Sequence, residues 1–372
     1  MTNVTTTNIP IYEPYIGDLE KQYVSECLDS SWISSRGKYI SLFEDEFAKK
    51  TNIKYASTVS NGTVALHLAI LALGIGPGDE VIVPTFTYIA SVNAIKYAGA
   101  TPVFVDSLID TWQIDPSDVE KKITKNTRAI MAVHLYGHPC DMYSLSAIAK
   151  EHNIFLIEDC AEAFGTKYDD QHVGSFGDIA TYSFFGNKTI TTGEGGMVVS
   201  NNETLINRVN HLKGQGLADH RQYWHDIVGY NYRLTNVACA IGFAQLQRAD
   251  EFINRKREIA KFYKNAFENT PYEFHKEANN VFHSYWMCSI LIDKNKCGRE
   301  SRDNLRKHLT HSGIETRPLF YPVHTMPMYH DRYQNHRTAE DISRRGINLP
   351  SYPQLTDEQL TYIINSVLEY NI

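Results

Sequence analysis

The sequence predicts an α/β protein built on a largely parallel, seven-stranded sheet with helices on both faces. Short apolar runs of four to seven residues, rich in Val and Ile, recur from about residue 54 onward. Helical apolar patterns separate most of these runs, which is typical of parallel strands joined by crossover helices. Sheets of this kind bind ligands at the carboxyl ends of their strands, so site residues are expected there.

The first part of the chain supplies most of the predicted elements. Residues 1–8 are polar and expected to be disordered. Asp18 is expected to cap a helix with apolar positions at Leu19, Tyr23 and Cys27, and a turn-rich loop follows at 30–38. The predicted strands span residues 55–60, 80–83, 102–106, 129–134, 154–158, 179–185 and 196–200. The predicted helices between them span residues 63–73, 88–97 and 142–151.

The remaining elements predict a second, smaller domain. One long helix is expected from near Thr235 to Tyr263, followed by a strand at 281–292, a helix at 302–312 that ends at Gly313, and a closing helix at 357–370. We therefore predict a large domain over residues 1–250, which includes an N-terminal arm, and a small C-terminal α/β domain over residues 251–372.

Composition excludes several classes of protein. The 372 residues include 36 Lys and Arg against 43 Asp and Glu, a net charge of −7, which argues against nucleic acid as a main partner. None of the six cysteines forms a C-x-x-C pair, so no metal site is predicted, and reduced thiols in the cytosol are expected. The N-terminus lacks a signal-peptide pattern, and the longest apolar stretch, 64–73, is about half a membrane span. A cytoplasmic protein without a membrane segment is expected.

The strongest chemical signal is Lys188, which lies between the apolar run at 179–185 and a glycine cluster. Asp159 ends an earlier apolar run at 155–159. A lysine amine can attack a carbonyl, and a strand-end acid can keep a cofactor nitrogen protonated, as a Schiff-base enzyme requires. Burial or nearby positive charge would then have to lower the lysine pKa from about 10.4. The plainer interpretation is a surface loop lysine.

Two further signals are weaker when taken alone. Gly62 and Thr63 lie at a turn from strand to helix, where free N–H groups and the helix dipole suit a phosphate. An ordinary turn with an asparagine cap explains the same residues. Glu162 follows Asp159 by three positions, and a salt bridge or helix cap explains this acidic pair better than a cofactor contact does.

Two later segments also carry polar side chains that could bind an anion. Asn231 and Arg233 interrupt a helical pattern, although a structural loop explains them better. The segment 315–327 is stiffened by three prolines and includes Arg, Tyr and His side chains that could hold a phosphorylated substrate. Its plainer interpretation is a rigid surface loop.

The order of these signals resembles that of fold-type I enzymes that depend on pyridoxal 5′-phosphate (PLP). The segments VSNGTVALHL (59–68), PTFTYIASVNA (84–94), SFFGNKTITTGEGGM (183–197) and YPVHTMPMY (321–329) more closely resemble the sugar aminotransferases of the DegT/DnrJ/EryC1/StrS family. The resemblance covers nearly the whole chain. It implies a fold-type I transferase with PLP as its cofactor.

The resemblance also implies roles for single residues. Lys188 matches the catalytic lysine that bonds the cofactor and later moves protons, and Asp159 matches the acid that pairs with the pyridine nitrogen. The implied cofactor-binding residues are Gly62, Thr63, Tyr88, Asp159, Glu162, Ser183, Lys188 and Asn231. Asn231 matches an asparagine that reaches the phosphate of the neighbouring subunit, which implies a homodimer with shared active sites. The implied substrate-binding residues are Trp32, Ser35, Arg317, Tyr321 and His324.

The activity implied by the resemblance is transfer of the amino group of L-glutamate to C4 of GDP-4-keto-6-deoxy-D-mannose for polysaccharide synthesis. An alternative is an aminotransferase that acts at C3 or C4 of another keto sugar, linked to dTDP or UDP. Glu162 favours C4, because glutamine is common at that position in 3-aminotransferases. A related sugar 3-dehydratase carries histidine where Lys188 stands. Intact Lys188 and Asp159 disfavour a non-catalytic regulator, and the missing Rossmann fingerprint disfavours a dehydrogenase.

Overall fold

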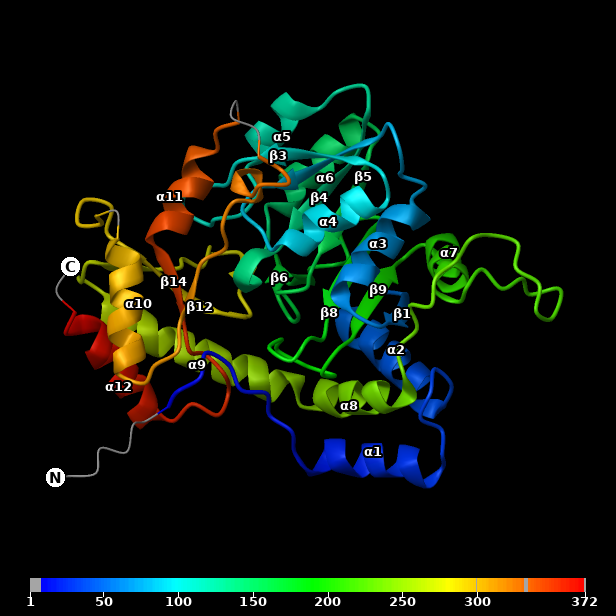
Figure 1. Ribbon diagram of the computed structural model, residues 1–372, viewed down its shortest axis with the longest axis horizontal. Helices are drawn as coiled ribbons and strands as arrows, with labels where there is room; N and C mark the ends of the chain where they lie inside the picture. Colours follow the sequence, from blue (N-terminus) through cyan, green and yellow to red (C-terminus); the bar gives the residue numbers. More distant parts are fainter. Residues whose placement is uncertain (1–7, 299, 331–333, 371–372) are drawn as a thin grey trace.

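The computed structural model describes residues 8–298, 300–330 and 334–370. Its largest sheet has seven strands in the order β1-β9-β8-β5-β4-β2-β3 (Figure 1). Their bounds are β1 Tyr55–Val59, β2 Glu80–Pro84, β3 Thr101–Val105, β4 Thr127–Val133, β5 Phe155–Asp159, β8 Ile179–Ser183 and β9 Gly196–Ser200. Apart from Asn8, the N-terminal residues expected to be disordered lie outside the described residues.

Strand direction confirms the predicted fold class. β8, β5, β4, β2 and β3 pair in parallel, whereas β9 is antiparallel to both of its neighbours, β8 and β1. The sheet is therefore mostly parallel, and each observed strand begins and ends within two residues of a predicted one.

Helices cover the two faces of this sheet because successive side chains on a strand point to opposite sides. Val81 and Met131 pack with α3, α4 and α7, while Ile82 and Ile130 pack with α5 and α6. Helices α2 and α8 cover the β8–β9 end of the second face. The helix bounds are α2 Lys38–Thr51, α3 Gly62–Ala72, α4 Ile89–Tyr97, α5 Pro116–Lys122, α6 Met142–Glu151, α7 Glu203–Lys213 and α8 Asn236–Gln247.

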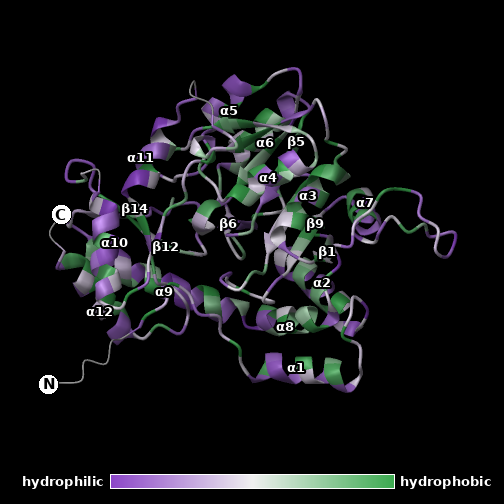
Figure 2. Cartoon of the chain, in the orientation of Figure 1, coloured by the Kyte–Doolittle hydropathy of each residue, from purple (hydrophilic) through white to green (hydrophobic). Residues whose placement is uncertain are grey.

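The C-terminal part forms its own antiparallel sheet, in the order β10-β12-β14-β13, with a separate apolar core (Figure 1). The outward helices α10 and α11 are largely hydrophilic (Figure 2). The bounds are α9 Ala249–Phe267, β10 Tyr272–Phe274, β12 Cys288–Ile292, α10 Ser301–His311, β13 Arg317–Pro318, η2 Val323–Thr325, α11 Arg337–Arg345, β14 Gly346–Leu349 and α12 Asp357–Leu368. The predicted division after residue 250 falls inside α9 and stays a prediction.

Shorter elements complete the described chain. A three-stranded sheet has the order β11-β6-β7. Strands β6 and β7 belong to the connection between β5 and β8, and β11 belongs to the C-terminal part of the chain, so this sheet links the two parts. The bounds are α1 Asp18–Asp29, η1 Leu135–Gly137, β6 Lys167–Tyr168, β7 Gln171–His172 and β11 Val281–Phe282. Across the described ranges, none of the helices combines the length and apolarity needed to cross a membrane.

Three predictions about single elements were wrong. Gly17, not Asp18, is the N-cap of α1, because Asp18 is already the first helical residue. The side chain of Glu20 accepts a hydrogen bond from the Gly17 N–H over 2.8 Å. The long helix expected up to Tyr263 is two helices, α8 and α9, which meet at Arg248. The expected strand at 281–292 breaks after Phe282, because Tyr285 takes a left-handed conformation with φ 48°. Helices α2, α5, α7 and α11 were not predicted.

Candidate active site

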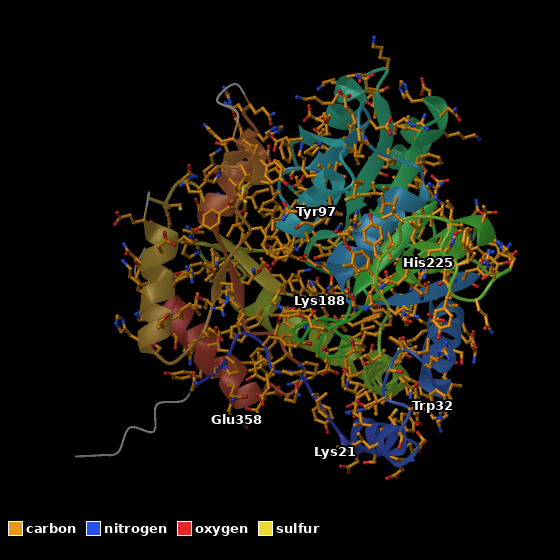
Figure 3. The ribbon with its side chains drawn as sticks, turned by 45° about the vertical axis from the view of Figure 1, so that its right-hand side comes forward. Lys21, Trp32, Tyr97, Lys188, His225 and Glu358 are labelled. Carbon is orange, nitrogen blue, oxygen red and sulfur yellow. The ribbon has the colours of Figure 1, made fainter. Side chains whose placement is uncertain are left out.

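A cavity of about 510 Å³ lies at the carboxyl edge of the large sheet, as expected for a parallel α/β fold. Val133 ends β4, Asp159 ends β5 and Ser183 ends β8, and all three side chains line it. The N-terminus of α3 and the turn before α4 close its sides. Lys188 lies near the middle of the molecule in Figure 3, and it also lines this cavity.

Lys188 is held by its own loop and by the N-terminal segment. Its N–H donates to the carbonyl oxygen of Phe185 over 2.9 Å, and the hydroxyl of Tyr12 donates to the Lys188 carbonyl oxygen over 2.7 Å. The Nζ atom lies 3.9 Å from the centroid of the Trp286 ring. Burial lowers the pKa of the Lys188 amine, while the carboxylates of Glu162 and Asp159 oppose this shift. A lysine with a lowered pKa is suited to nucleophilic attack on a carbonyl.

Asp159 is almost completely buried at the base of the cavity. Its Oδ2 accepts a hydrogen bond from Ser91 Oγ over 2.7 Å, and its Oδ1 accepts one from the Ala161 N–H over 3.1 Å. Burial raises the pKa of Asp159, and both hydrogen bonds counteract that rise. A cationic ring nitrogen in the cavity would be the partner that such a buried carboxylate needs.

Glu162 lies close to the same lysine. Its Oε2 accepts a hydrogen bond over 2.8 Å from the N–H of Tyr136, whose φ of 56° places it in the left-handed region. Burial raises the pKa of Glu162 to about 7, and the charge of Lys188 limits that rise. Lys188, Asp159 and Glu162 thus form a group of ionisable side chains whose charges interact in one cavity, which is typical of a catalytic site.

The N-terminus of α3 forms one end of the cavity. The side chain of Asn61 caps the helix by accepting from the Val64 N–H over 3.0 Å, while Gly62 and Thr63 form the first turn. N–H groups in a first helical turn have no partner within the helix, and the residues of this turn, 62–64, line the cavity. A Cβ on Gly62 would lie 2.8 Å from the Cβ of Ser183, so only glycine allows β8 to approach this turn. The arrangement of Gly62, Thr63 and Ser183 fits a phosphate group.

Tyr88 forms one side wall. It is the N-cap residue of α4, its side chain remains 56% exposed, and its ring lies 5.6 Å from that of Phe320. An exposed aromatic face beside Asp159 and Lys188 provides a surface on which a planar ring can stack. Together with the phosphate-binding turn and the buried acid, these residues fit pyridoxal phosphate.

Three other residues suggested for the site lie outside this cavity. Asn231 is exposed and pairs with Gly214 in a short antiparallel bridge. Trp32 is 54% exposed and lines a different cavity, together with Arg36 and Lys38. It lies far from Lys188 in Figure 3. Ser35 lies half-buried on the same loop. Within one chain, the structure therefore does not bring Asn231, Trp32 or Ser35 to Lys188.

Of the three remaining candidates for substrate binding, two line a neighbouring cavity of about 360 Å³. Arg317 and Tyr321 lie there, and the walls formed by Tyr88, Asn187, Trp286 and Phe320 belong to both cavities. His324 lies in neither cavity. It is 3% exposed, its Nδ1 is 2.7 Å from Thr85 Oγ1, and its Nε2 is 3.2 Å from Glu340 Oε1. With both ring nitrogens engaged, His324 ties η2 to the end of β2 instead of facing a substrate.

Sequence reasoning missed four residues that contact the candidate catalytic groups: Ser91, Tyr136, Trp286 and Tyr12. Ser91 follows Tyr88 by three positions in a helix and so shares its face, which is a usable signal. Tyr12, Tyr136 and Trp286 come from distant segments and carry no local signal of this kind.

One cluster with metal-ligating residue types occurs among the described residues, formed by His134, Glu158 and Cys160. The Cys140 N–H donates to His134 Nδ1 over 3.1 Å, so Nε2 carries the proton that faces Glu158. Glu158 also accepts from the backbone N–H groups of Gly174, Phe176 and Gly177 at 2.7, 2.8 and 2.7 Å. The carboxylate is fully used, so this cluster is a hydrogen-bonded support beneath Asp159.

Comparisons with known proteins agree with this site. Residues 14–368 match the DegT/DnrJ/EryC1/StrS aminotransferase family. A protein named GDP-perosamine synthase from Escherichia coli O157:H7 is 64% identical over 362 residues, which cover 97% of this chain and 98% of that relative. Another of the same name from Vibrio cholerae is 52% identical over 366 residues, covering 97% and 99%. The PLP form of Spr1654 from Streptococcus pneumoniae is a solved structure with a TM-score of 0.92, 27% identity, and coverage of 97% and 98%.

The fold and the cavity define a PLP-dependent sugar aminotransferase. The chain belongs to the DegT/DnrJ/EryC1/StrS aminotransferase family.

Proposed function

We propose that this protein transfers the amino group of L-glutamate to C4 of GDP-4-keto-6-deoxy-D-mannose, and so makes GDP-perosamine for polysaccharide synthesis. One structural observation carries the aminotransferase part: Lys188, with its lowered pKa, shares a cavity with the buried carboxylate of Asp159 and the N-terminus of α3. The sugar specificity is supported by full-length similarity to proteins named GDP-perosamine synthase, at 64% and 52% identity.

The proposed cofactor-binding roles are supported by the positions of the residues in the cavity. Gly62, Thr63 and Ser183 would hold the phosphate at the start of α3, and Tyr88 would stack on the ring. Asp159 would keep the pyridine nitrogen protonated. When bound, the protonated cofactor accepts the electron pair released as a C–H bond of the substrate breaks.

Lys188 and Glu162 are proposed to transfer protons during the reaction. With the cofactor bound and the amine of Lys188 free, Lys188 would take the Cα proton of glutamate and would return a proton to the reactive carbon of the cofactor. Burial lowers the pKa of this amine, which favours the unprotonated form that a base requires. The charge of Lys188 acts on Glu162, and the pKa of about 7 for Glu162 allows this carboxyl group to bind or release a proton near neutral pH. The same groups act in the opposite direction when the keto sugar replaces 2-oxoglutarate.

The neighbouring cavity is the proposed site of the sugar nucleotide. Arg317 can pair with a diphosphate, and Tyr321 adds a hydroxyl and an aromatic face. The walls that the two cavities share support this proposal, in which C4 of the sugar would reach the cofactor while the nucleotide stays in the neighbouring cavity.

We further propose a homodimer in which Asn231 of one subunit completes the cofactor site of the other. Asn231 lies exposed beside a projecting segment after α7 that carries the exposed side chains of Tyr223, Trp224 and Val228 (Figure 1). A second copy would cover this apolar surface. The six cysteines are free thiols, five of them buried, which supports a reducing cytoplasmic compartment.

The deciding experiment is incubation of the PLP-loaded protein with L-glutamate and GDP-4-keto-6-deoxymannose, followed by mass analysis of the nucleotide sugar. We expect a product in which an amino group replaces the keto oxygen, and none from Lys188→Ala, which should also lose the visible absorbance of bound cofactor. Parallel incubations with dTDP- and UDP-linked keto sugars test the alternative substrates. Faster amination of one of those sugars would refute the GDP assignment, and turnover by Lys188→Ala would refute the mechanism.

A further inference from the structure

Trp286 contacts the catalytic loop in two ways. Its ring centroid lies 3.9 Å from Lys188 Nζ, and its Nε1–H donates to the carbonyl oxygen of Asn187 over 2.8 Å. The indole therefore touches the amine and also binds the residue that precedes the lysine. Both contacts come from the C-terminal part of the chain, about one hundred residues beyond the lysine.

The backbone around Trp286 is shaped to place the ring there. Tyr285 has a φ of 48°, and its N–H donates to His283 Nδ1 over 2.9 Å. This turn interrupts the extended chain between β11 and β12 and directs the next side chain into the cavity. Trp286 is 5% exposed, and its ring stacks at 10° to that of Tyr136, with centroids 6.1 Å apart. A left-handed tyrosine is costly, so the surrounding contacts must maintain it.

The charged groups around the Lys188 amine attract its protonated form, and the indole of Trp286 adds a direct contact. Asp159 and Glu162 attract the protonated form of Lys188 from the end of β5, while Tyr88 and Glu194 line other parts of the cavity. Among the described residues, no hydrogen bond joins Nζ to either carboxylate. An aromatic face attracts an ammonium group through its quadrupole, and most strongly where water is excluded. The ring of Trp286 is in direct contact with the amine.

We propose that Trp286 is a positioning residue for Lys188, whose indole face holds the lysine amine beside the cofactor whenever that amine is not bonded to it. This inference rests on the proposed amino transfer, in which Lys188 leaves the cofactor and must remain close enough to move a proton. A long, flexible side chain would otherwise sample many rotamers, and holding it in one place lowers the entropic part of the barrier.

Two substitutions separate the ring from its hydrogen bond. Trp286→Phe keeps an aromatic face and loses the donor to Asn187, whereas Trp286→Leu loses both. Trp112→Phe is the matched control, because Trp112 is a buried tryptophan that stacks on His275, with centroids 4.0 Å apart, and does not line the cavity. Circular dichroism and cofactor content would establish that each variant is folded.

The first measurement uses the cofactor-free protein. The rate at which an acylating reagent modifies Lys188, followed by peptide mass analysis across pH, reports the pKa of its amine. Because the ring favours the charged form, we expect that pKa to fall in Trp286→Leu and to stay near the wild-type value in Trp286→Phe and Trp112→Phe. An unchanged or raised pKa in Trp286→Leu overturns the inference.

The second measurement is the single-turnover reaction of the PLP-loaded protein with glutamate, followed by absorbance. We expect Trp286→Leu to be slower by roughly two- to thirtyfold at saturating glutamate, with little change in the half-saturating concentration. Equal losses in the Phe and Leu variants would assign the effect to the Asn187 hydrogen bond and overturn the role of the ring. If the wild-type protein itself fails to react with glutamate, the proposed donor is wrong, which is a distinct result.

Discussion

Ser91 Oγ donates a hydrogen bond to Asp159 Oδ2 over 2.7 Å and thereby joins the first turns of α4 to the end of β5. Thr87 Oγ1 lies 3.2 Å from the same hydroxyl and extends the network toward Tyr88. The acid assigned to the pyridine nitrogen, Ser91 and Thr87 therefore form one hydrogen-bonded unit, and Thr87 directly precedes the tyrosine assigned to the ring face.

Replacing Ser91 tests that unit. A hydrogen bond to a charged group contributes about 1.5–3 kcal/mol, so Ser91→Ala should slow the glutamate half-reaction by roughly ten- to hundredfold. The loss should also raise the pKa of Asp159 further, because this hydrogen bond lowers it. Stopped-flow absorbance measures the rate. Ser91→Thr keeps the hydroxyl and should retain most activity, whereas a fully active Ser91→Ala would show that the contact is unimportant.

The raised pKa of Glu162 predicts that the stability of the cofactor-free protein depends on pH. Its pKa rises from 4.5 to about 7 on folding, so the native state holds its proton more tightly and loses stability as pH increases through that window. Glu162→Gln removes this cost, which amounts to about 3 kcal/mol at most. The variant should exceed wild type in free energy of unfolding at pH 8, and the difference should shrink toward pH 5.

Urea unfolding at pH 5 and pH 8 measures the difference. Glu194→Gln is the matched control, since it removes an acid from the exposed rim of the same cavity. A pH-independent difference between Glu162→Gln and wild type would contradict the assignment of a raised pKa.

Arg317 should affect one substrate and not the other. If it pairs with the diphosphate, Arg317→Met should raise KM for the nucleotide sugar by roughly tenfold or more, because a charged hydrogen bond is lost. The glutamate half-reaction should keep its wild-type rate. Steady-state kinetics with each substrate varied in turn distinguish the two effects. Arg344→Met is the control, since Arg344 pairs with Asp341 and lines neither cavity. Equal effects on both half-reactions would place Arg317 elsewhere in the mechanism.

A shared active site predicts complementation between two inactive variants. Asn231→Ala should bind the cofactor roughly ten- to hundredfold more weakly, because a hydrogen bond to a phosphate is lost. After subunit exchange with Lys188→Ala at limiting cofactor, the mixed dimer contains one site with both native residues. Activity should then recover to about one quarter of the wild-type value, as random pairing requires. If the mixture contains folded dimers but does not recover activity, Asn231 contributes to the cofactor site of its own subunit.

The chemistry at strand ends was predictable because the signals for it are local. Asp159 and Ser183 each close a short apolar run, and parallel strands bring such ends to a common edge whatever the connections between them. Gly62 and Thr63 open a helix directly after a strand, which marks an anion-binding turn within a few residues. Their convergence on Lys188 in one cavity agrees with these expectations.

Other contacts depend on loops that carry no periodic pattern. Trp286 was expected inside a continuous strand, and only the left-handed turn at Tyr285 brings its ring to the lysine. His324 was expected to face the substrate, yet Thr85 and Glu340 occupy both of its ring nitrogens. In each case the partner lies on a segment that is remote in sequence or depends on a backbone turn that side-chain periodicity does not encode.

The amino-acid sequence by itself determined the α/β class, the strand ends and the proposed catalytic pair of Lys188 and Asp159, because periodicity and turn chemistry act over a few residues. Only the tertiary structure decided which distant groups complete the site: Ser91 on Asp159, the Tyr136 N–H on Glu162, and the Trp286 ring on the lysine amine. Those contacts arise when packed layers bring separate segments together, and their geometry depends on the whole core.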